Sequence, residues 1–234
     1  MTRWWWLAVV AACGDNGPLE QPIYTWNGEH EVTASGLDLT GPGDPGLYDA
    51  IDHDTAGGAV VLFYGHDPPH ETSYETLESL LSRAEADGLP TLTYADLAHG
   101  PSKAGICLSF DDDEVEDWIA MRGLLAAHHA HVSFFVTGYI YMTDTQHAML
   151  HELAADGHTI EAHGVNHQNA VTYIAAHGLD AYLTEEVQPS IDVLRADGFD
   201  PVAYAHPGGA HTPELDDALA SRIRFARGIH GALE

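Results

Sequence analysis

The sequence predicts an α/β fold in which helices alternate with the strands of a parallel sheet, either open or closed into a barrel. Three helical segments end alike, in Ala-Asp-Gly at 86–88, 155–157 and 196–198, and a strand candidate follows each. Glycine there supplies the left-handed residue that stops a helix. Such alternation is typical of parallel sheets, in which the chemistry sits at the C-terminal ends of the strands.

The composition fits one globular domain with an acidic surface. The chain has 234 residues, of which 45% are apolar, enough for one α/β domain with a sizeable core. Lys and Arg total 8 against 36 Asp and Glu, so the formal net charge is −28. A surface that negative repels nucleic acid, which we exclude as a partner. The composition leaves the oligomeric state open.

Residues 1–13 are predicted to be a lipoprotein signal peptide. One basic residue precedes a short apolar stretch that ends in small residues and is too short to span a membrane. Residues 10–13, Val-Ala-Ala-Cys, resemble the bacterial lipobox, whose cysteine is lipidated after cleavage. We therefore expect Cys13 to anchor the protein to a membrane of a bacterial cell envelope. A buried N-terminal strand is the alternative.

Residues 14–57 are predicted to be a flexible tether with one short strand at most. The segment is rich in Gly, Pro, Asp and Thr, and no helical or strand period persists in it. The folded domain is expected to span 58–234.

The alternation of strands and helices begins with an apolar run at 59–64, which predicts a buried strand. A helix follows, with Thr72 and Glu75 spaced as a capping box. Apolar periodicity and glycine or proline boundaries predict the later elements. The further strands expected are 91–93, 106–110, 132–136, 158–162, 202–205 and 222–226.

Polar residues follow several of these strands directly. The strand at 106–110 ends in three carboxylates, Asp111 to Asp113. Adjacent like charges cost energy unless compensated, and a divalent cation is a usual compensator. A solvated acidic turn or a helix N-terminus is the alternative. The shared position at strand ends favours a functional role, and it applies also to His66, His163, His167 and His206.

His163 and His167, four residues apart, form an Asp-His-His set with an acid from another strand end. Catalytic zinc takes about three protein ligands and keeps a position for water, which becomes a nucleophile near neutral pH. We expect one divalent ion, zinc first, although cobalt, nickel and manganese also suit these ligands. His147 and His151 share the spacing but lie within an amphipathic helix, and Glu161 lies inside a strand.

These residues resemble the motifs of the polysaccharide deacetylases, carbohydrate esterase family 4, with the NodB-homology domain. The first family motif, Thr-Phe-Asp-Asp-Gly, stands at 109–113 as Ser-Phe-Asp-Asp-Asp. The match implies that Asp111 is the general base and Asp112 a metal ligand. The second motif stands at 163–167, His-Gly-Val-Asn-His, and implies that both histidines are ligands. The resemblance also implies a distorted (β/α) barrel of about seven parallel strands.

The third family motif stands at 204–209 as Tyr-Ala-His-Pro-Gly-Gly. The resemblance implies that Tyr204 and Pro207 contact the substrate and that the backbone N–H near Gly208 binds the oxyanion. The arginine and the second aromatic residue of the family motif are missing. Asp111 therefore lacks its usual cationic neighbour, for which Arg227 is a candidate.

The last family motif, a strand ending in Leu-x-His-Asp, stands at the front of this chain, at residues 64–67. The chain thus resembles a circularly permuted deacetylase, as in the subgroup acting on biofilm poly-N-acetylglucosamine. We expect strand 59–64 to lie between the 106–110 and 222–226 strands, and His66 to lie at the same barrel mouth as the acids. The resemblance implies that His66 is the general acid; a loop histidine without a role is the alternative.

The function implied is a metal-dependent hydrolase that removes N-acetyl groups from an amino-sugar polymer at the cell envelope. Asp111 would take a proton from water and His66 would protonate the leaving amine. One alternative, suggested by the incomplete third motif, is a catalytically silent carbohydrate-binding lipoprotein. Another is a metal-dependent amidohydrolase acting on a small non-sugar amide, and the fold alone cannot separate the three.

Overall fold

Seven parallel strands close into a barrel among residues 25–26, 29–38, 40–56, 58–100 and 104–229, the residues that the computed structural model describes. Neighbours pair in the order β2, β3, β5, β6, β7, β8 and β9, and β9 returns to β2. The predicted barrel of about seven parallel strands is thereby confirmed. The strands are β2 (Glu31–Gly36), β3 (Val60–Gly65), β5 (Gly105–Asp112), β6 (Ser133–Val136), β7 (Thr159–Ala162), β8 (Ala203–Ala205) and β9 (Phe225–Ile229).

Two short strands extend this ring without belonging to it. The first, β1 (Thr25–Trp26), pairs antiparallel with β3. The second, β4 (Thr91–Leu92), pairs parallel with β5.

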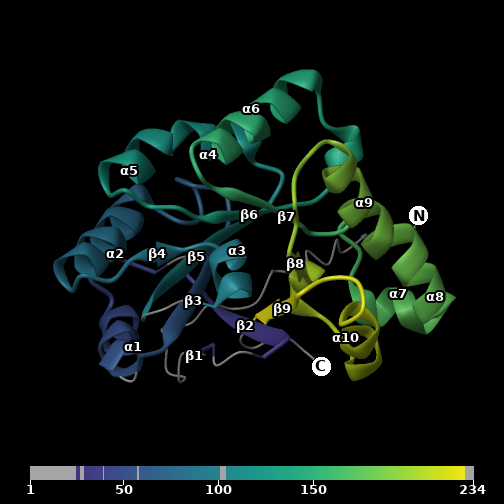
Figure 1. The fold of residues 1–234 in the computed structure, drawn as a ribbon, viewed down its shortest axis with the longest axis horizontal. Helices are drawn as coiled ribbons and strands as arrows, with labels where there is room; N and C mark the ends of the chain where they lie inside the picture. Colours follow the sequence, from purple (N-terminus) through teal and green to yellow (C-terminus); the bar gives the residue numbers. More distant parts are fainter. Residues whose placement is uncertain (1–24, 27–28, 39, 57, 101–103, 230–234) are drawn as a thin grey trace, which may run out of the picture.

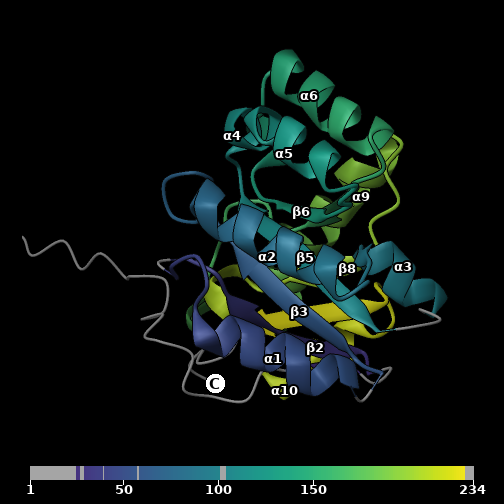
Figure 2. The ribbon, with the colours of Figure 1, turned by 90° about the vertical axis from the view of Figure 1, so that its left-hand side faces the viewer.

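Most helices surround the ring on its outside, whereas α3 lies over the middle of the ring (Figure 1). Figure 2 shows α1 and α10 on the side of the barrel opposite α6. No helix in the described part of the chain has the length and apolar character needed to cross a membrane. The α-helices are α1 (Pro45–Ala56), α2 (Tyr74–Ala86), α3 (Tyr94–His99), α4 (Val115–Ala120), α5 (Arg122–Ala127), α6 (Asp144–Ala155), α7 (Ala170–His177), α8 (Leu179–Tyr182), α9 (Gln188–Ala196) and α10 (Pro213–Leu219). The shorter turns are η1 (Tyr139–Tyr141), the π-helical η2 (Leu183–Val187) and η3 (Pro207–Gly209).

β3 is buried on both faces, which explains its uninterrupted apolar run. Successive side chains point to opposite faces of a strand. Leu62 and Tyr64 therefore lie in the core inside the barrel, whereas Val61 and Phe63 pack in the core between barrel and helices. Tyr94 of α3 belongs to the inner core.

The expected tether at 14–57 is wrong for the part that the structure describes. Within it, β2 pairs with both β3 and β9, and α1 follows. The sequence signal was weak because β2 places only two apolar side chains, Val32 and Ala34, in the inner core. The predicted signal peptide and Cys13 lie outside the described residues and stay predictions.

The expected neighbours of β3 are half right. β3 pairs with β5, from Val60 opposite Gly105 to Gly65 opposite Phe110. Its other neighbour is β2 and not the last strand, because β2 stands between β3 and β9. Both β2 and β3 are therefore needed to close the barrel. The circular permutation stays an inference from the family resemblance.

Candidate active site

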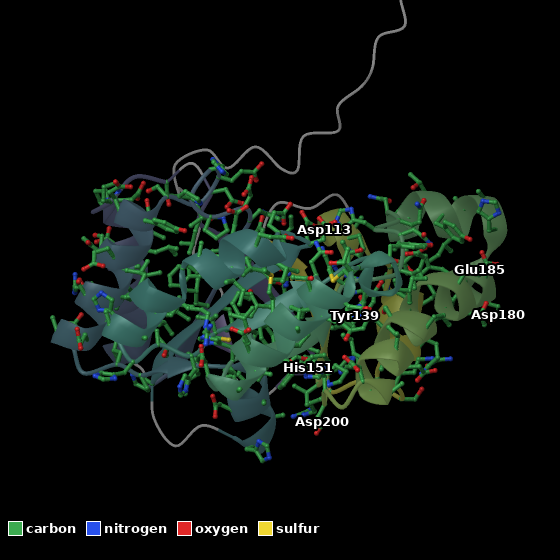
Figure 3. The ribbon with its side chains drawn as sticks, turned by 90° about the horizontal axis from the view of Figure 1, so that it is seen from above. Asp113, Tyr139, His151, Asp180, Glu185 and Asp200 are labelled. Carbon is green, nitrogen blue, oxygen red and sulfur yellow. The ribbon has the colours of Figure 1, made fainter. Side chains whose placement is uncertain are left out.

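The predicted catalytic and metal-binding residues gather at the C-terminal ends of the barrel strands. Asp113, directly after β5, and Asp200, which precedes β8, lie on opposite sides of the molecule (Figure 3). The first side is the barrel mouth, because all strands of the ring are parallel and end there. His66 follows β3, Asp111 and Asp112 end β5, and His163 follows β7.

The backbone at the end of β5 lets two adjacent carboxylates serve one site. Neighbouring residues of a strand normally point to opposite faces. Asp112, however, has a φ of 82°, a left-handed conformation that aspartate tolerates better than most residues. Its Oδ1 lies 3.1 Å from Nε2 of His167 and 3.4 Å from Nε2 of His163. Strain of this kind is often kept at functional sites.

A hydrogen bond to the barrel wall orients His163. Its Nδ1 lies 2.9 Å from the carbonyl oxygen of Ala205 in β8, so Nε2 is the nitrogen that faces Asp112. Gly164 follows with a φ of 82°, and a Cβ there would lie 3.2 Å from Oε2 of Glu186. A glycine is therefore required between the first histidine and the rest of the loop.

Buried Glu186, from the π-helical turn η2, braces the loop between the two histidines. Its Oε2 accepts hydrogen bonds from the backbone N–H groups of Val165 and Asn166, at 3.1 and 2.8 Å. Its Oε1 accepts a third from the side chain of Asn166, at 2.5 Å. Sequence reasoning missed this residue, because a charged residue in a helix pattern is most simply read as solvated.

The three groups fit a divalent metal ion. Oδ1 of Asp112 is buried and has no hydrogen-bond partner among the described residues, although two imidazole nitrogens lie within 3.4 Å of it. Burial raises the pKa of Asp112, but the imidazoles of His163 and His167 outweigh it and hold the pKa well below its usual range. Two imidazole nitrogens and one carboxylate oxygen are a donor set that catalytic zinc uses.

Arg227 supplies the cation that the third motif lacks. This residue of β9 is fully buried, and its Nη2 lies 2.5 Å from both carboxylate oxygens of Asp111. Its guanidinium also lies over the rings of Tyr64 and Phe135, 5.1 and 4.9 Å from their centroids. The candidate suggested by the sequence is thus confirmed in contact with Asp111, and it reaches the mouth from a different strand.

His66 is held by a carboxylate that sequence reasoning placed in the tether. Asp38 follows β2, and its two oxygens lie 2.8 Å from the backbone nitrogen and 2.6 Å from Nδ1 of His66. Nε2 of His66 then lies 3.9 Å from Oδ2 of Asp111. The hydroxyl of Thr72 also donates to Asp38 instead of capping α2, where Ser73 is the N-cap.

This arrangement keeps His66 protonated at neutral pH. Burial lowers the pKa of the imidazole, but the hydrogen bond to Asp38 and the charge of Asp111 outweigh it and raise the pKa from 6.5 to about 9. His66 can therefore donate a proton below about pH 9 and loses that ability as the pH rises through this value.

Asp38→Asn is expected to shift the alkaline limb of the activity profile to lower pH. The substitution removes the charge that favours imidazolium, so the pKa of His66 falls and the proton is lost at a lower pH. The limb is read from kcat/KM for acetate release between pH 6 and 10. Asp156→Asn is the control, because Asp156 is exposed and pairs with Arg122. An unchanged limb in Asp38→Asn would separate His66 from the proton transfer.

The third motif is only partly placed as expected. Tyr204 is fully buried in the core between barrel and helices, and its hydroxyl lies 3.2 Å from that of Tyr182. The expected contact of its side chain with substrate is therefore wrong, because residue 204 faces outward in β8. Pro207 is buried as well, whereas Gly208 is exposed, with a φ of 62°. Gly208 stays a predicted oxyanion donor.

The competing candidates have structural partners of their own. Nε2 of His147 lies 3.0 Å from the carbonyl oxygen of Tyr139, and Nε2 of His151 lies 2.8 Å from Asp197. Glu161 is fully buried, and its Oε2 accepts hydrogen bonds from the backbone of Val202 and Ala203. These contacts favour structural roles for all three.

Comparison with known proteins supports the resemblance to the polysaccharide deacetylases. Residues 98–222, more than half of the 234-residue chain, match the family described as “Polysaccharide deacetylase”. No protein with a curated description matches the sequence.

Solved structures of deacetylases share the fold. IcaB from Ammonifex degensii is 17% identical, with a TM-score of 0.58 over 74% of this chain and 86% of that one. The Streptococcus pyogenes deacetylase PplD, solved in complex with acetate, is 20% identical, with a TM-score of 0.56 over 71% and 80%. A de-N-acetylase from Aggregatibacter actinomycetemcomitans is 15% identical, with a TM-score of 0.57 over 72% and 86%.

Proposed function

Since this chain belongs to the polysaccharide deacetylase family, we propose that it is a metal-dependent hydrolase that removes N-acetyl groups from an amino-sugar polymer. One observation carries the proposal. The Asp112, His163 and His167 donor set lies at the same barrel mouth as an Arg-bound carboxylate, Asp111, and an imidazole, His66. These are a metal site, a base and an acid within one opening.

The residues divide the hydrolysis between them. A divalent ion held by Asp112, His163 and His167 would polarise the acetyl carbonyl and acidify water. Asp111 accepts a proton from the water that attacks the carbonyl carbon, and Arg227 orients its carboxylate. His66 donates its proton to the amine nitrogen as the C–N bond breaks. Acetate and a free amine leave, and the proton taken up by Asp111 can return to His66, 3.9 Å away.

Acetate release tests this function directly. Purified protein with added Zn²⁺ is incubated with poly-N-acetylglucosamine, chitin oligomers, peptidoglycan and a small amide such as acetanilide. Release from at least one polymer, and none from acetanilide, is expected. Release from acetanilide alone would indicate an amidohydrolase of small molecules.

The alternative of a silent carbohydrate-binding protein rests on the incomplete third motif, which lacks its arginine and its second aromatic residue. Arg227 compensates for the missing arginine, because it contacts Asp111 from β9. Binding of a polymer without acetate release, in protein loaded with Zn²⁺, Co²⁺, Ni²⁺ or Mn²⁺, would still decide for the silent protein.

Two exposed apolar side chains beside the metal-binding loop suit a polymer substrate. Ile140 and Tyr141 of η1 are 51% and 67% exposed, the exposed large hydrophobic residues of the described chain. The Tyr141 hydroxyl donates to Oδ1 of Asn166, at 2.9 Å, and Asn166 is bound in turn by Glu186. The ring is thereby fixed to the loop that carries His163 and His167, where the apolar face of a neighbouring sugar could pack against it.

Tyr141→Ala is expected to raise KM for long oligomers by about 2- to 10-fold, the equivalent of about 0.5–1.5 kcal/mol of ring packing. KM for a single N-acetylated sugar should change little if the ring packs on a neighbouring sugar of the polymer, as proposed. Tyr141→Phe keeps the ring without its hydroxyl and is the matched control. Equal KM values for long oligomers in wild type and Tyr141→Ala would contradict the role.

A place at the bacterial cell envelope, through a lipid on Cys13, remains part of the proposal. Its support is the lipobox-like sequence at 10–13. Cys13→Ser is expected to move the protein, expressed from its own signal sequence, from the detergent phase to the aqueous phase. Each buried acyl CH₂ contributes about 0.8 kcal/mol, so an anchor of several chains gives a clear partition. Aqueous recovery of both forms would remove the anchor from the proposal.

A further inference from the structure

A second cluster of metal-binding side chains lies on the outer side of the barrel wall, under α10. His206 follows β8, His211 precedes α10, and Asp216 lies within it. Nε2 of His206 lies 2.9 Å from Oδ1 of Asp216, and Nδ1 of His211 lies 2.6 Å from Oδ2. The two imidazole rings stack with their centroids 4.9 Å apart.

Hydrogen bonding within the chain accounts for only part of this cluster, because Nδ1 of His211 is hydrogen-bonded to Oδ2 of Asp216 but His206 is not paired in this way. His206 is 1% exposed, and neither of its ring nitrogens has a hydrogen-bond partner among the described residues. Oδ1 of Asp216 also lacks one, although it lies 2.9 Å from His206, so these two atoms are close but not aligned as donor and acceptor. Buried polar groups are rarely left in this condition unless an ion or water completes them.

The site at the barrel mouth shares one feature with this cluster, a buried carboxylate oxygen that lies near imidazole nitrogen but has no hydrogen-bond partner among the described residues. At the mouth, Oδ1 of Asp112 lies within 3.4 Å of two imidazole nitrogens, whereas Oδ1 of Asp216 lies near one, that of His206. In both clusters two nitrogens and one oxygen can be chosen that lie within 4.8 Å of one another. Ligand atoms around one tetrahedral zinc ion are about 3.4 Å apart, as follows from bonds of about 2.1 Å.

The surrounding backbone makes room for the second cluster. Gly228 of β9 has no side chain, and a Cβ there would lie 3.2 Å from Nε2 of His211. Thr212 caps α10 by accepting a hydrogen bond from the N–H of Leu215, which fixes the start of the helix that carries Asp216. The ring of His206 lies next to that of Tyr204, 5.6 Å away, and so belongs to the outer face of β8.

We propose that His206, His211 and Asp216 bind a second divalent transition-metal ion of the zinc class, with a structural role. The ion would join the segment after β8, which carries Pro207 and Gly208, to α10. Two neutral imidazoles and one carboxylate favour zinc, cobalt or nickel over magnesium or calcium, which prefer oxygen ligands. Because the cluster lies outside the barrel, it takes no part in proton transfer, and the inference does not depend on the proposed function.

Zinc stoichiometry tests the proposal. The whole protein is stripped with EDTA and dialysed against Zn²⁺ at a buffered free concentration, and zinc is counted by mass spectrometry. We expect two equivalents in the wild type, one each in His163→Ala and His211→Gln, and none in the double variant. His99→Gln replaces an exposed histidine outside both clusters and should keep two. Loss of all zinc in His163→Ala, or two equivalents in His211→Gln, would overturn the second site.

Two further measurements keep the result decisive. Zn²⁺ should raise the melting temperature of His163→Ala but not that of the double variant, since an ion stabilises only a site it binds. Co²⁺ added to His163→Ala should give visible absorption bands of a tetrahedral site, which Asp216→Asn in the same background abolishes.

If His211→Gln fails to fold, the zinc content of Asp216→Asn replaces that of His211→Gln. Zinc bound with no melting shift and no cobalt bands would identify an adventitious ion only, against the proposal.

Discussion

Replacing His163 by alanine is expected to remove one equivalent of metal per chain and to lower kcat/KM for deacetylation by about 10³-fold or more. His163 is 1% exposed, and the carbonyl oxygen of Ala205 fixes its ring. The change leaves Asp112 and His167, two ligands where catalytic zinc takes about three. The size of the effect follows from the several kcal/mol by which a metal ion stabilises the charge of the transition state, because each 1.4 kcal/mol changes the rate about tenfold. Metal content and acetate release are measured on one preparation.

His147→Ala is the matched control. His147 also stands four residues before another histidine, but its Nε2 lies 3.0 Å from a backbone carbonyl oxygen inside the outer helical layer. Both metal content and activity should survive this change. An unchanged metal content in His163→Ala, together with a loss in His147→Ala, would reject the site at the barrel mouth.

His66→Ala is expected to lower kcat by about 10²–10⁴-fold while metal content stays as in the wild type. The leaving amine needs a proton, and His66 is the imidazole beside Asp111 at the mouth. An acetyl ester with a 4-nitrophenolate leaving group needs no such proton, so hydrolysis of that ester should fall far less. This difference between the two substrates is a readout that misfolding would not produce.

His70→Ala, an exposed histidine of the same loop after β3, is the control and should behave as the wild type. Full amide hydrolysis by His66→Ala would assign the general acid elsewhere. An equal loss on the amide and the ester would point to a structural role for His66.

The site could be predicted from the sequence to the extent that its parts are local. Asp111 and Asp112 end one strand, and the spacing of His163 and His167 is contained in one loop, so strand-end position and spacing were enough to find them. The alternation of strands and helices predicted a parallel sheet, and the resemblance to the family implied that it closes into a barrel. These features depend on residues close together in the chain, where hydrophobic periodicity and helix capping determine secondary structure.

The partners of the catalytic groups could not be predicted with the same certainty, because they come from distant strands. Asp38 reaches His66 from β2, whose two inner apolar residues left the strand hidden in a segment rich in Gly and Pro. Arg227 reaches Asp111 across 116 positions of sequence and could only be named as a candidate. Glu186 supports the metal-binding loop from a helical turn.

By itself, then, the sequence determined the alternating α/β chain and the carboxylates and histidines that end its strands. Only the closed barrel decided which side chains meet and which face each points to. Tyr204 illustrates the limit: its motif suggested the substrate side, but the register of β8 turns the ring into the outer core. A one-residue change in register exchanges the inner and outer faces of a strand. Pairing across the sheet, which no local pattern encodes, fixes that choice.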